Sequence, residues 1–438
     1  MQVDHCDDEH LIEVRKKHFL PTAHLYHDHP LHLVKAQGMY VWDNDGRRYL
    51  DAIGGIVCIA AGHNHPKIKA VLQQMLMDNE IQHTSMLYLS RHPVDLAEAL
   101  VDEAPPGLDR VAFTNSGSEA NELAFMTARQ ATGETMMISL RHGYHGGTSA
   151  ALAQCGHYNW RFRGQPTASA TSALEPYCYR CPFNQKPESC DLECAKNVET
   201  TIQTSTHGKI AGMIAEPVMG VGGFIAPPKA YFDEVTRIVH DYGGKYISDE
   251  VQTGAGRCGG AFLLSRELGI DADLISMAKG LGNGAAIGAV LMKTGDAKAL
   301  AGKLYFNTFG GDPYQTAQAR VNMDVIREEN LIANAHAMGQ RLLDGLEQLK
   351  TRHTLIGDVR GRGLLLGVEL VKDRKSKAFA SAEATRVMEK CKEKGLLLGK
   401  GGLMGNVIRI APPLSINAEQ IDEMLKVIDQ ALTETNDE

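Results

Sequence analysis

The sequence lacks any long apolar run and any long basic run, and each absence argues against a class of protein. No segment approaches the roughly 20 apolar residues that a helix needs to cross a bilayer, so a membrane-spanning protein is not expected. The 438 residues carry 45 Lys and Arg against 53 Asp and Glu, a formal charge of -8. Because no basic tract could follow a phosphate backbone, we expect no nucleic-acid partner.

Low-complexity tracts are also missing, and we expect no targeting segment. The first twenty residues contain several acids and no apolar core segment, unlike a secretory signal or a transit peptide. The nine cysteines are expected to be mostly reduced thiols. These features favour a cytoplasmic protein, and the length is sufficient for a large core divided into two or three parts.

Short apolar runs alternate with helical stretches through the middle of the chain, which predicts an α/β protein with a wrapped, mostly parallel sheet. Six strands are predicted, at residues 111–114, 136–140, 210–215, 245–248, 274–276 and 289–292.

Beyond about Tyr314 a long amphipathic helical region and glycine-punctuated apolar strands predict a smaller α+β domain. An apolar helix face after an Asn417 cap closes the chain, formed by Ile421, Met424, Leu425, Ile428 and Leu432. We predict a segment 1–60 that joins the small domain, a large domain 61–317 and the small domain 318–438.

The first candidate site is the stretch TNSGSEANELAFMTARQATG, residues 114–133. It reads as a strand, a tight loop and a helix that opens with a capping box between Ser116 and Glu119. The small residues Ser116, Gly117 and Ser118 leave backbone N–H groups exposed at the helix start, where a phosphate group fits. An ordinary capped helix would have the same sequence features.

The stretch SDEVQTGAGRCGG, residues 248–260, has the G-x-G-x-x-G spacing of a dinucleotide-binding loop. Asp249 and Glu250 stand at the strand end where a pyrophosphate would arrive, and a helix could begin only after the glycines. A dehydrogenase is therefore supported by the spacing alone. A carboxylate at this edge of a parallel sheet suits a cation, such as a protonated ring nitrogen.

Lys279 lies directly after an apolar strand in the stretch DADLISMAKGLGNGAAIGAV. A lysine at such a place is usually solvated or paired, but one beside apolar residues can lose its proton near neutral pH and form a Schiff base with an aldehyde. A phosphate site, a carboxylate for a ring nitrogen and a Schiff-base lysine together describe the requirements of pyridoxal 5'-phosphate, PLP.

Nine stretches in this order carry a resemblance that covers nearly the whole chain: YVWDNDGRRYLDAIGGI with GHNHP, NSGSEAN, RHGYHGG, AEPVMG, SDEVQTGAGRCGG, ISMAKGLG, NTFGGDP and NVIRIAPPL. The chain resembles a class III aminotransferase, a PLP enzyme of fold type I. Through PYCYRCPF it is also similar to the alanine:glyoxylate and ω-amino-acid aminotransferases of that class. The resemblance implies transfer of an amino group from an amino acid or ω-amine to a keto acid, namely pyruvate, glyoxylate or 2-oxoglutarate.

The resemblance also implies a cofactor-binding set, made up of Ser116, Gly117, Ser118, Tyr144, Asp249, Val251, Gln252, Lys279 and Thr308. In that family Lys279 would carry the internal aldimine and move the substrate proton, and Asp249 would hold the pyridinium as the second catalytic residue. Val251 and Tyr144 would cover the two ring faces, Gln252 would lie near the phenolic oxygen, and the three residues at the helix start would bind the phosphate. Thr308 would reach the phosphate of a neighbouring subunit, which implies a homodimer or a dimer of dimers.

The substrate end is implied to involve Arg409, Glu216 and Tyr88. Arg409 would bind the substrate carboxylate with its two-pronged guanidinium, and Glu216 would pair with Arg409 when no carboxylate is present. A plain ion pair is the alternative for these two residues. A PLP-dependent phospho-lyase acting on a phosphorylated amine would use the same Lys279 and Asp249, and it remains the alternative function.

Two groups of residues raise the possibility of a metal. Cys178, Cys181, Cys190 and Cys194 follow the spacing C-x2-C-x8-C-x3-C within what we call the cysteine-rich segment, residues 176–194. Zinc ligands and reduced thiols in a packed loop are both compatible with this spacing, and the resemblance favours the loop. His63 and His65 are expected to belong to a local turn, and His145 suits a turn or a site equally well. We predict no bound metal.

Overall fold

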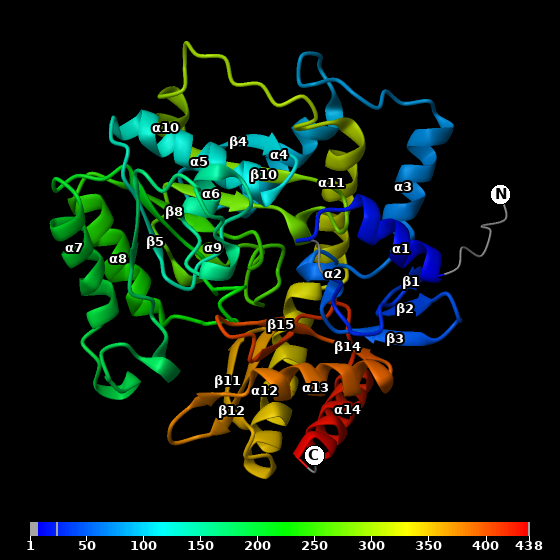
Figure 1. Ribbon diagram of the computed structural model, residues 1–438. Helices are drawn as coiled ribbons and strands as arrows, with labels where there is room; N and C mark the ends of the chain where they lie inside the picture. The colour runs from blue at the N-terminus through cyan, green and yellow to red at the C-terminus, as the bar shows by residue number, and fades with distance from the viewer. Residues whose placement is uncertain (1–7, 23–24, 437–438) are drawn as a thin grey trace.

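The computed structural model describes residues 8–22 and 25–436, and a seven-stranded sheet lies at its centre (Figure 1). Along the sheet the order is β4-β10-β9-β8-β7-β5-β6. The bounds are β4 Leu108–Thr114, β5 Met137–Leu140, β6 Ala170–Ala173, β7 Gly212–Ala215, β8 Lys245–Asp249, β9 Leu274–Met277 and β10 Gly288–Lys293. Strand β10 runs antiparallel to both neighbours and the other pairs are parallel, which confirms the predicted mostly parallel sheet.

Helices cover this sheet, as the apolar strands require. All four residues of β5, β7 and β9 are buried, because parallel strands are packed on both faces. The covering helices α5 (Gly117–Thr132), α7 (Glu193–Ser205) and α8 (Lys229–Asp241) each contact strands of the sheet. Figure 1 shows α7 and α8 on the side of the sheet where β5 lies, next to the edge strand β6.

The C-terminal elements, yellow to red in Figure 1, form a second layer of antiparallel strands and helices. Its strand order is β11-β12-β16-β15, with β13 on β12. The bounds are β11 Ile356–Arg362, β12 Leu365–Asp373, β13 Ala378–Phe379, β15 Gly399–Gly401, β16 Val407–Ile410, α12 Leu331–Arg352, α13 Ser381–Glu393 and α14 Ala418–Asn436. Asn417 Oδ1 accepts a hydrogen bond from Gln420 N at 2.9 Å, which confirms the predicted cap of α14.

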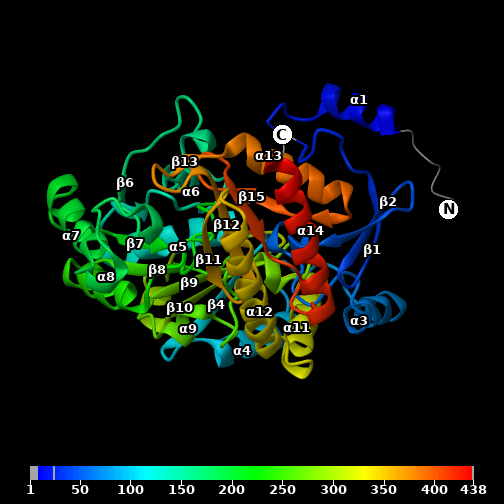
Figure 2. The ribbon, with the colours of Figure 1, turned by 90° about the horizontal axis from the view of Figure 1, so that it is seen from below.

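The N-terminal strands lie beside the C-terminal elements (Figure 2). They are β1 (Leu33–Gln37), β2 (Tyr40–Asp43) and β3 (Arg48–Asp51), and β3 pairs in parallel with β14 (Leu396–Leu397). The remaining helices are α1 Asp8–His18, α2 Gly54–Val57, α3 Pro66–Met77, α4 Arg91–Glu103, α6 Ser149–Ala153, α9 Leu264–Leu268, α10 Thr294–Lys298 and α11 Pro313–Glu328. The domain boundaries given above stay predictions.

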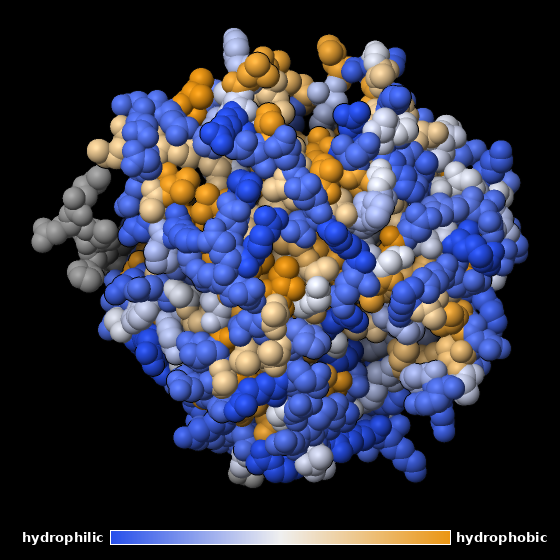
Figure 3. Space-filling view, turned by 180° about the vertical axis from the view of Figure 1, so that it is seen from behind, coloured by the Kyte–Doolittle hydropathy of each residue, from blue (hydrophilic) through white to orange (hydrophobic). Residues whose placement is uncertain are grey.

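The surface is mainly hydrophilic on the face turned away from the view of Figure 1. Figure 3 shows apolar residues there in separate patches among hydrophilic ones. Across residues 8–22 and 25–436, none of the helices combines the length and the apolar composition that a bilayer crossing requires.

Candidate active site

A cavity of about 550 Å³ lies where the middle sheet meets the C-terminal strands. Most of the predicted site residues line it together, namely Ser116, Gly117, Ser118, Tyr144, Glu216, Asp249, Val251, Gln252, Lys279 and Arg409. They come from the start of α5, from the loop after β5, from the ends of β7, β8 and β9 and the residues that follow, and from β16. Because parallel strands end at the same edge of a sheet, residues far apart in sequence converge there.

Lys279 follows the buried strand β9 by two residues and lies on the cavity wall. Its backbone has φ +44°, in the left-handed region that is uncommon for residues other than glycine. Burial lowers the pKa of its amine, and the nearby positive charge of Arg409 lowers it further. Both effects favour the neutral amine, which is the nucleophilic form.

Asp249 ends β8, and its carboxylate is held by a buried set of donors. Asn121 Nδ2 donates to Asp249 Oδ2 at 2.8 Å, and His145 Nδ1 lies 2.8 Å from the same oxygen. Asp249 Oδ1 accepts from Val251 N at 3.1 Å. The carboxylate is therefore fixed in direction, and its negative charge is available to a cation in the cavity.

Asn121 and His145 are site residues that the sequence reasoning did not assign. Asn121 lies on α5, and its Nδ2 also donates to the His145 carbonyl at 2.8 Å. The His145 side chain is fully buried and its Nε2 has no partner among the described residues. Their stretches, NSGSEAN and RHGYHGG, could have indicated them, because a polar residue that is buried needs a hydrogen-bond partner.

The start of α5 has the features of an anion site. Ser116 Oγ accepts from Glu119 N at 3.2 Å, which confirms half of the capping box, whereas the Glu119 carboxylate accepts from Asn115 N at 2.8 Å instead of the predicted partner. A Cβ at Gly117 would come within 2.9 Å of Val251, so only glycine fits there. The first N–H groups of a helix lack partners within it and favour an anion.

Tyr144 and Trp160 form an aromatic wall. Their ring centroids are 4.9 Å apart, and both residues line the cavity. Tyr144 N donates to Glu216 Oε1 at 3.0 Å, which fixes the loop after β5. Trp160 was not predicted, because it belongs to a short 3-10 turn with no motif of its own.

Arg409 has a different partner from the one expected. Its Nη2 donates to Gln252 Oε1 at 2.6 Å, and its guanidinium lies 4.5 Å from the ring centroid of Phe224. The Arg409 Nε is buried and has no partner among the described residues. Burial lowers the pKa of this guanidinium.

Glu216 is engaged by the backbone, which explains why it does not pair with Arg409. Its Oε1 accepts from Tyr144 N, and its Oε2 accepts from Gly220 N at 2.7 Å. Of the ion pairs formed by the described residues, none joins Glu216 to Arg409. The expected Glu216–Arg409 ion pair is therefore absent here. Burial raises the pKa of Glu216 to about 7, with a further increase from the charge of Asp249.

Tyr88 and Thr308 do not line the cavity. Tyr88 is 74% exposed, and Thr308 lies on an exposed loop beside Asn307. The two stretches nevertheless approach each other, because His83 Nδ1 lies 2.7 Å from Asp312 Oδ2. Within one subunit, the structure therefore leaves these two predicted residues outside the site.

The histidines and cysteines singled out in the sequence take separate partners. His63 Nε2 lies 2.8 Å from Asp51 Oδ2, and His65 Nε2 lies 3.0 Å from Glu329 Oε1. The four thiols of the cysteine-rich segment are free, and burial raises the pKa of Cys194 to about 12. Between residues 8 and 436, leaving out 23 and 24, no group of three or more His, Cys, Asp or Glu is arranged to hold a metal ion.

The residues of the cavity fit PLP. They provide an amine, a buried carboxylate with fixed direction, a helix start where a side chain at Gly117 would not fit, and an aromatic wall. The amine suits the aldehyde of PLP, and the carboxylate suits its ring nitrogen. The helix start suits its phosphate, and the aromatic wall suits its flat ring.

Comparisons with known proteins show which proteins this chain is similar to. The family model "Aminotransferase class-III" matches residues 22–432. A curated relative, "Alanine--glyoxylate aminotransferase 2 homolog 2, mitochondrial" of Arabidopsis thaliana, is 40% identical over 424 residues, 97% of this chain and 87% of the relative.

Two solved structures illustrate the range of related activities. An amine transaminase from an uncultivated Pseudomonas species in PLP-bound form has a TM-score of 0.87 and 30% identity, covering 93% of this chain and 95% of its own. A phospholyase from Arthrobacter in complex with phosphoethanolamine also has a TM-score of 0.87 and 30% identity, covering 97% and 99%.

Proposed function

The chain belongs to the class III aminotransferase family, and from this premise we propose which of its residues perform each part of the reaction. It is a PLP-dependent aminotransferase that moves an amino group from an amine donor to a keto acid. The observation that carries the residue assignment is the convergence of Lys279, Asp249 and the start of α5 on one cavity.

Bound PLP withdraws electrons from the substrate carbon that carries the amino group. Lys279 Nζ would hold the cofactor covalently, and its free amine would be the base that takes the proton from that carbon. Burial supports this role, because a lowered pKa makes the neutral, basic form of the Lys279 amine easier to reach. Asp249 keeps the ring nitrogen protonated, and Asn121 and His145 hold its carboxylate in place.

The other assigned residues position the cofactor. Gly117 and Ser118 bind the phosphate through backbone N–H groups with Ser116 beside them. Tyr144 and Val251 would cover the two faces of the ring. These roles are supported by the lining of the cavity and by the missing side chain at Gly117, which lets Val251 approach the start of α5.

Arg409 binds the substrate carboxylate, and Gln252 is its partner when the carboxylate is absent. The support is the 2.6 Å hydrogen bond between them and the unsatisfied Nε of Arg409. Gln252 also approaches the phenolic oxygen of the cofactor in this assignment. Glu216 shapes the substrate end by fixing the backbone at Tyr144 and Gly220.

We propose a keto acid with one carboxylate, pyruvate or glyoxylate, as the acceptor. The lysines and arginines among the described cavity residues are Lys279, Lys400 and Arg409. Lys400 is opposite Ile408 in the β15–β16 register, so its side chain leaves on the face away from Arg409. Its Nζ donates to Thr385 Oγ1 at 3.0 Å on α13. A second carboxylate, as in 2-oxoglutarate, would lack a cation of its own.

We propose that the enzyme is a homodimer or a dimer of dimers with sites shared across the interface. Support comes from apolar side chains that two neighbouring loops expose, namely Ile81, Met86, Leu87, Leu89, Leu304, Tyr305, Phe306 and Phe309. Exposed apolar groups of this number mark an interaction surface. Thr308 and Tyr88, which lie on these loops, would then serve the partner's cavity.

The experiment that tests the function crosses amine donors with pyruvate, glyoxylate and 2-oxoglutarate on the purified protein with PLP. We expect turnover with the first two acceptors and much less with 2-oxoglutarate. The phospho-lyase alternative, favoured by the likeness to the Arthrobacter phospholyase, predicts release of inorganic phosphate from a phosphorylated amine without any keto acid. Cytoplasmic location stays a prediction that cell fractionation tests.

A further inference from the structure

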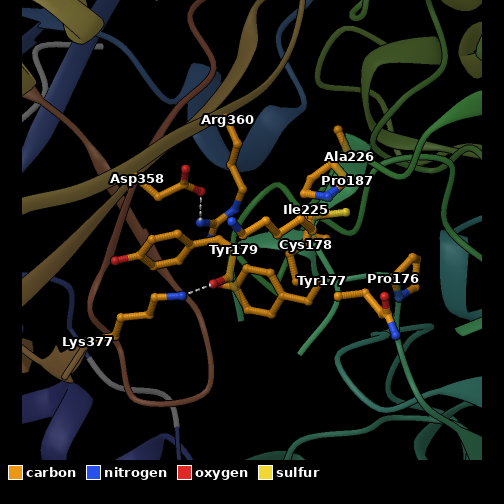
Figure 4. Close-up of a pocket in the computed structure, with 12 residues that line it drawn as sticks. Pro176, Tyr177, Cys178, Tyr179, Pro187, Ile225, Ala226, Asp358, Arg360 and Lys377 are labelled. Carbon is orange, nitrogen blue, oxygen red and sulfur yellow. Dashed lines mark hydrogen bonds and ion pairs between the residues drawn. The ribbon is translucent and has the colours of Figure 1, made fainter. Parts of the chain in front are cut away.

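A second cavity, of about 440 Å³, lies between the cysteine-rich segment and the strand β11 (Figure 4). Tyr177 and Tyr179 line it from the cysteine-rich segment, and Asp358 and Arg360 line it from β11. Figure 4 shows Asp358 bonded to Arg360, with the side chains of Tyr177 and Tyr179 close by. The reaction proposed above uses none of them.

Hydrogen-bond donors outnumber acceptors around this cavity. Arg360 donates through Nη1 to Asp358 at 2.8 Å and to Glu369 at 2.7 Å. Its Nε donates to Gly223 O at 2.9 Å, but its buried Nη2 has no partner among the described residues. The Tyr179 hydroxyl is also buried without a partner. Lys186 lines the same cavity, and no hydrogen bond or ion pair of its side chain is found in the part of the chain that the structure describes. Buried donors without acceptors cost free energy, which a ligand with acceptor oxygens would recover.

Charge and apolar area together define the kind of ligand. The lining carries three cations, Lys186, Arg360 and Lys377, against one carboxylate, Asp358, so the excess is two positive charges. Arg360 is balanced by two carboxylates, Asp358 and Glu369, of which Glu369 does not line the cavity. The unbalanced positive charge of the lining therefore comes from Lys186 and Lys377. Apart from Cys178 and the polar Gln185, the remaining lining residues are apolar or aromatic, namely Pro176, Tyr177, Tyr179, Pro187, Ile225 and Ala226.

We propose that this cavity is a second binding site, for a small organic carboxylate with an apolar or aromatic body. The carboxylate faces Arg360, Tyr179 and Lys186, and the body lies against Tyr177 and Ile225. Inorganic phosphate would satisfy the donors but would leave the apolar walls uncovered, so it binds more weakly.

One loop, residues 221–225, contributes a residue to the second cavity and another to the active-site cavity. Val221 lines the active-site cavity, and Ile225, four residues later, lines the second cavity. Arg360 holds the loop between them through Gly223 O. Val221 O accepts from Gly402 N at 2.9 Å, in the stretch that borders Arg409. A ligand in the second cavity therefore bears on a loop of the active site.

The test uses benzoate as the probe and two native thiols as reporters on the PLP-loaded enzyme. Cys178 is exposed and lines the second cavity, whereas Cys58 lines the active-site cavity. Alkylation of each thiol by a maleimide is followed by peptide mass spectrometry. At ten times its dissociation constant, benzoate should slow alkylation of Cys178 about tenfold, and benzamide, which lacks the charge, should not. The alkylation measurement needs no turnover, so its outcome does not depend on whether the proposed function is correct.

Variants assign the protection to this cavity. Lys186→Gln should weaken benzoate protection of Cys178 without disturbing the fold, because the side chain is exposed. Arg360→Gln should abolish it, and Lys209→Gln, an exposed lysine elsewhere, should leave it unchanged. The proposal is overturned if benzoate protects Cys58 alone, if it protects neither thiol, or if protection of Cys178 persists in both Lys186→Gln and Arg360→Gln.

Discussion

At the residue scale, two acids that the sequence places near strand ends, Asp249 and Glu216, have different kinds of hydrogen-bond partner in the cavity. Asp249 meets Asn121 Nδ2 and His145 Nδ1, each at 2.8 Å, and these partners come from two other segments. Glu216 meets two backbone N–H groups instead. The difference suits different tasks, because a carboxylate held by side chains beside an open cavity can face a ligand cation. A carboxylate with both oxygens occupied by the backbone mainly shapes the loop.

Lys279→Ala should abolish covalent cofactor binding and turnover. The variant loses both the amine that holds PLP and the base that moves the substrate proton, so we expect a rate loss on the order of 10⁴-fold or more. Borohydride reduction followed by mass spectrometry should place the cofactor on Lys279 in the native enzyme and nowhere in the variant. Lys400→Ala is the matched control, since its Nζ is bonded to Thr385. Native turnover in Lys279→Ala would refute the assignment.

The raised pKa of Glu216 predicts that the free energy of unfolding depends on pH. Its pKa in the folded chain is raised to about 7 by burial, whereas the unfolded chain loses this proton near its ordinary value of about 4.3. Between these values the unfolded state binds fewer protons, so folding stability falls by up to about 1.4 kcal/mol per pH unit as the pH rises. Glu216→Gln lacks this titration.

Urea unfolding at pH 5, 6, 7 and 8 measures the effect. The stability of the native protein relative to Glu216→Gln should decline from pH 5 to pH 7 and then level off. Glu188→Gln, at an exposed position, serves as the control for a lost carboxyl group. A constant difference between native protein and Glu216→Gln would mean that the two backbone N–H groups keep Glu216 ionised throughout.

At the element scale, two glycines of β15 make room for Arg409. A Cβ at Gly401 would lie 2.5 Å from Arg409 Cδ, and Gly399 is directly opposite Arg409 in the register. The long side chain can therefore lie across β15 and reach Gln252. Two glycines of the stretch KGLLLGKGG are thus explained by the space that the Arg409 side chain needs.

Gly401→Ala should weaken binding of substrates that carry a carboxylate. The added methyl group displaces Arg409, so we expect kcat/KM for alanine to fall about tenfold, while an uncharged amine loses much less. Cofactor binding should not change. Gly295→Ala, on α10 with open space around it, is the control. Equal losses for both donors in single-turnover measurements would show that Arg409 does not bind the carboxylate.

The elements also show how far the sequence could predict the molecule. All six predicted strands of the middle sheet are present, because strands buried on both faces appear as continuous apolar runs. Strand β6 was missed because ATSA, residues 170–173, is an edge strand with mixed burial. The partner of Glu216 could not be predicted, because Tyr144 is 72 residues away and the contact depends on how two loops fold together.

At the scale of the whole molecule, the active site is assembled from parts that are separate in the chain. The middle sheet contributes Asp249 and Lys279, the C-terminal strands contribute Arg409, and the N-terminal stretch after β3 contributes Ile56 and Cys58. The cavity thus forms only when these parts pack together. In the dimer that we propose, the exposed apolar loops that carry Tyr88 and Thr308 would extend the same principle to a second copy of the chain.

Complementation between two inactive variants tests this sharing. Thr308→Glu should abolish activity by repelling the phosphate of the partner's cofactor, and Lys279→Ala should abolish it in its own cavity. In a mixed dimer with two-fold symmetry, the Thr308→Glu chain keeps its lysine and receives Thr308 from the Lys279→Ala chain, so one site is intact. Random mixing after unfolding and refolding should therefore restore about one quarter of native activity. If mixed dimers form, as shown by differently tagged chains, and activity stays absent, then Thr308 acts within its own subunit and the shared site is wrong.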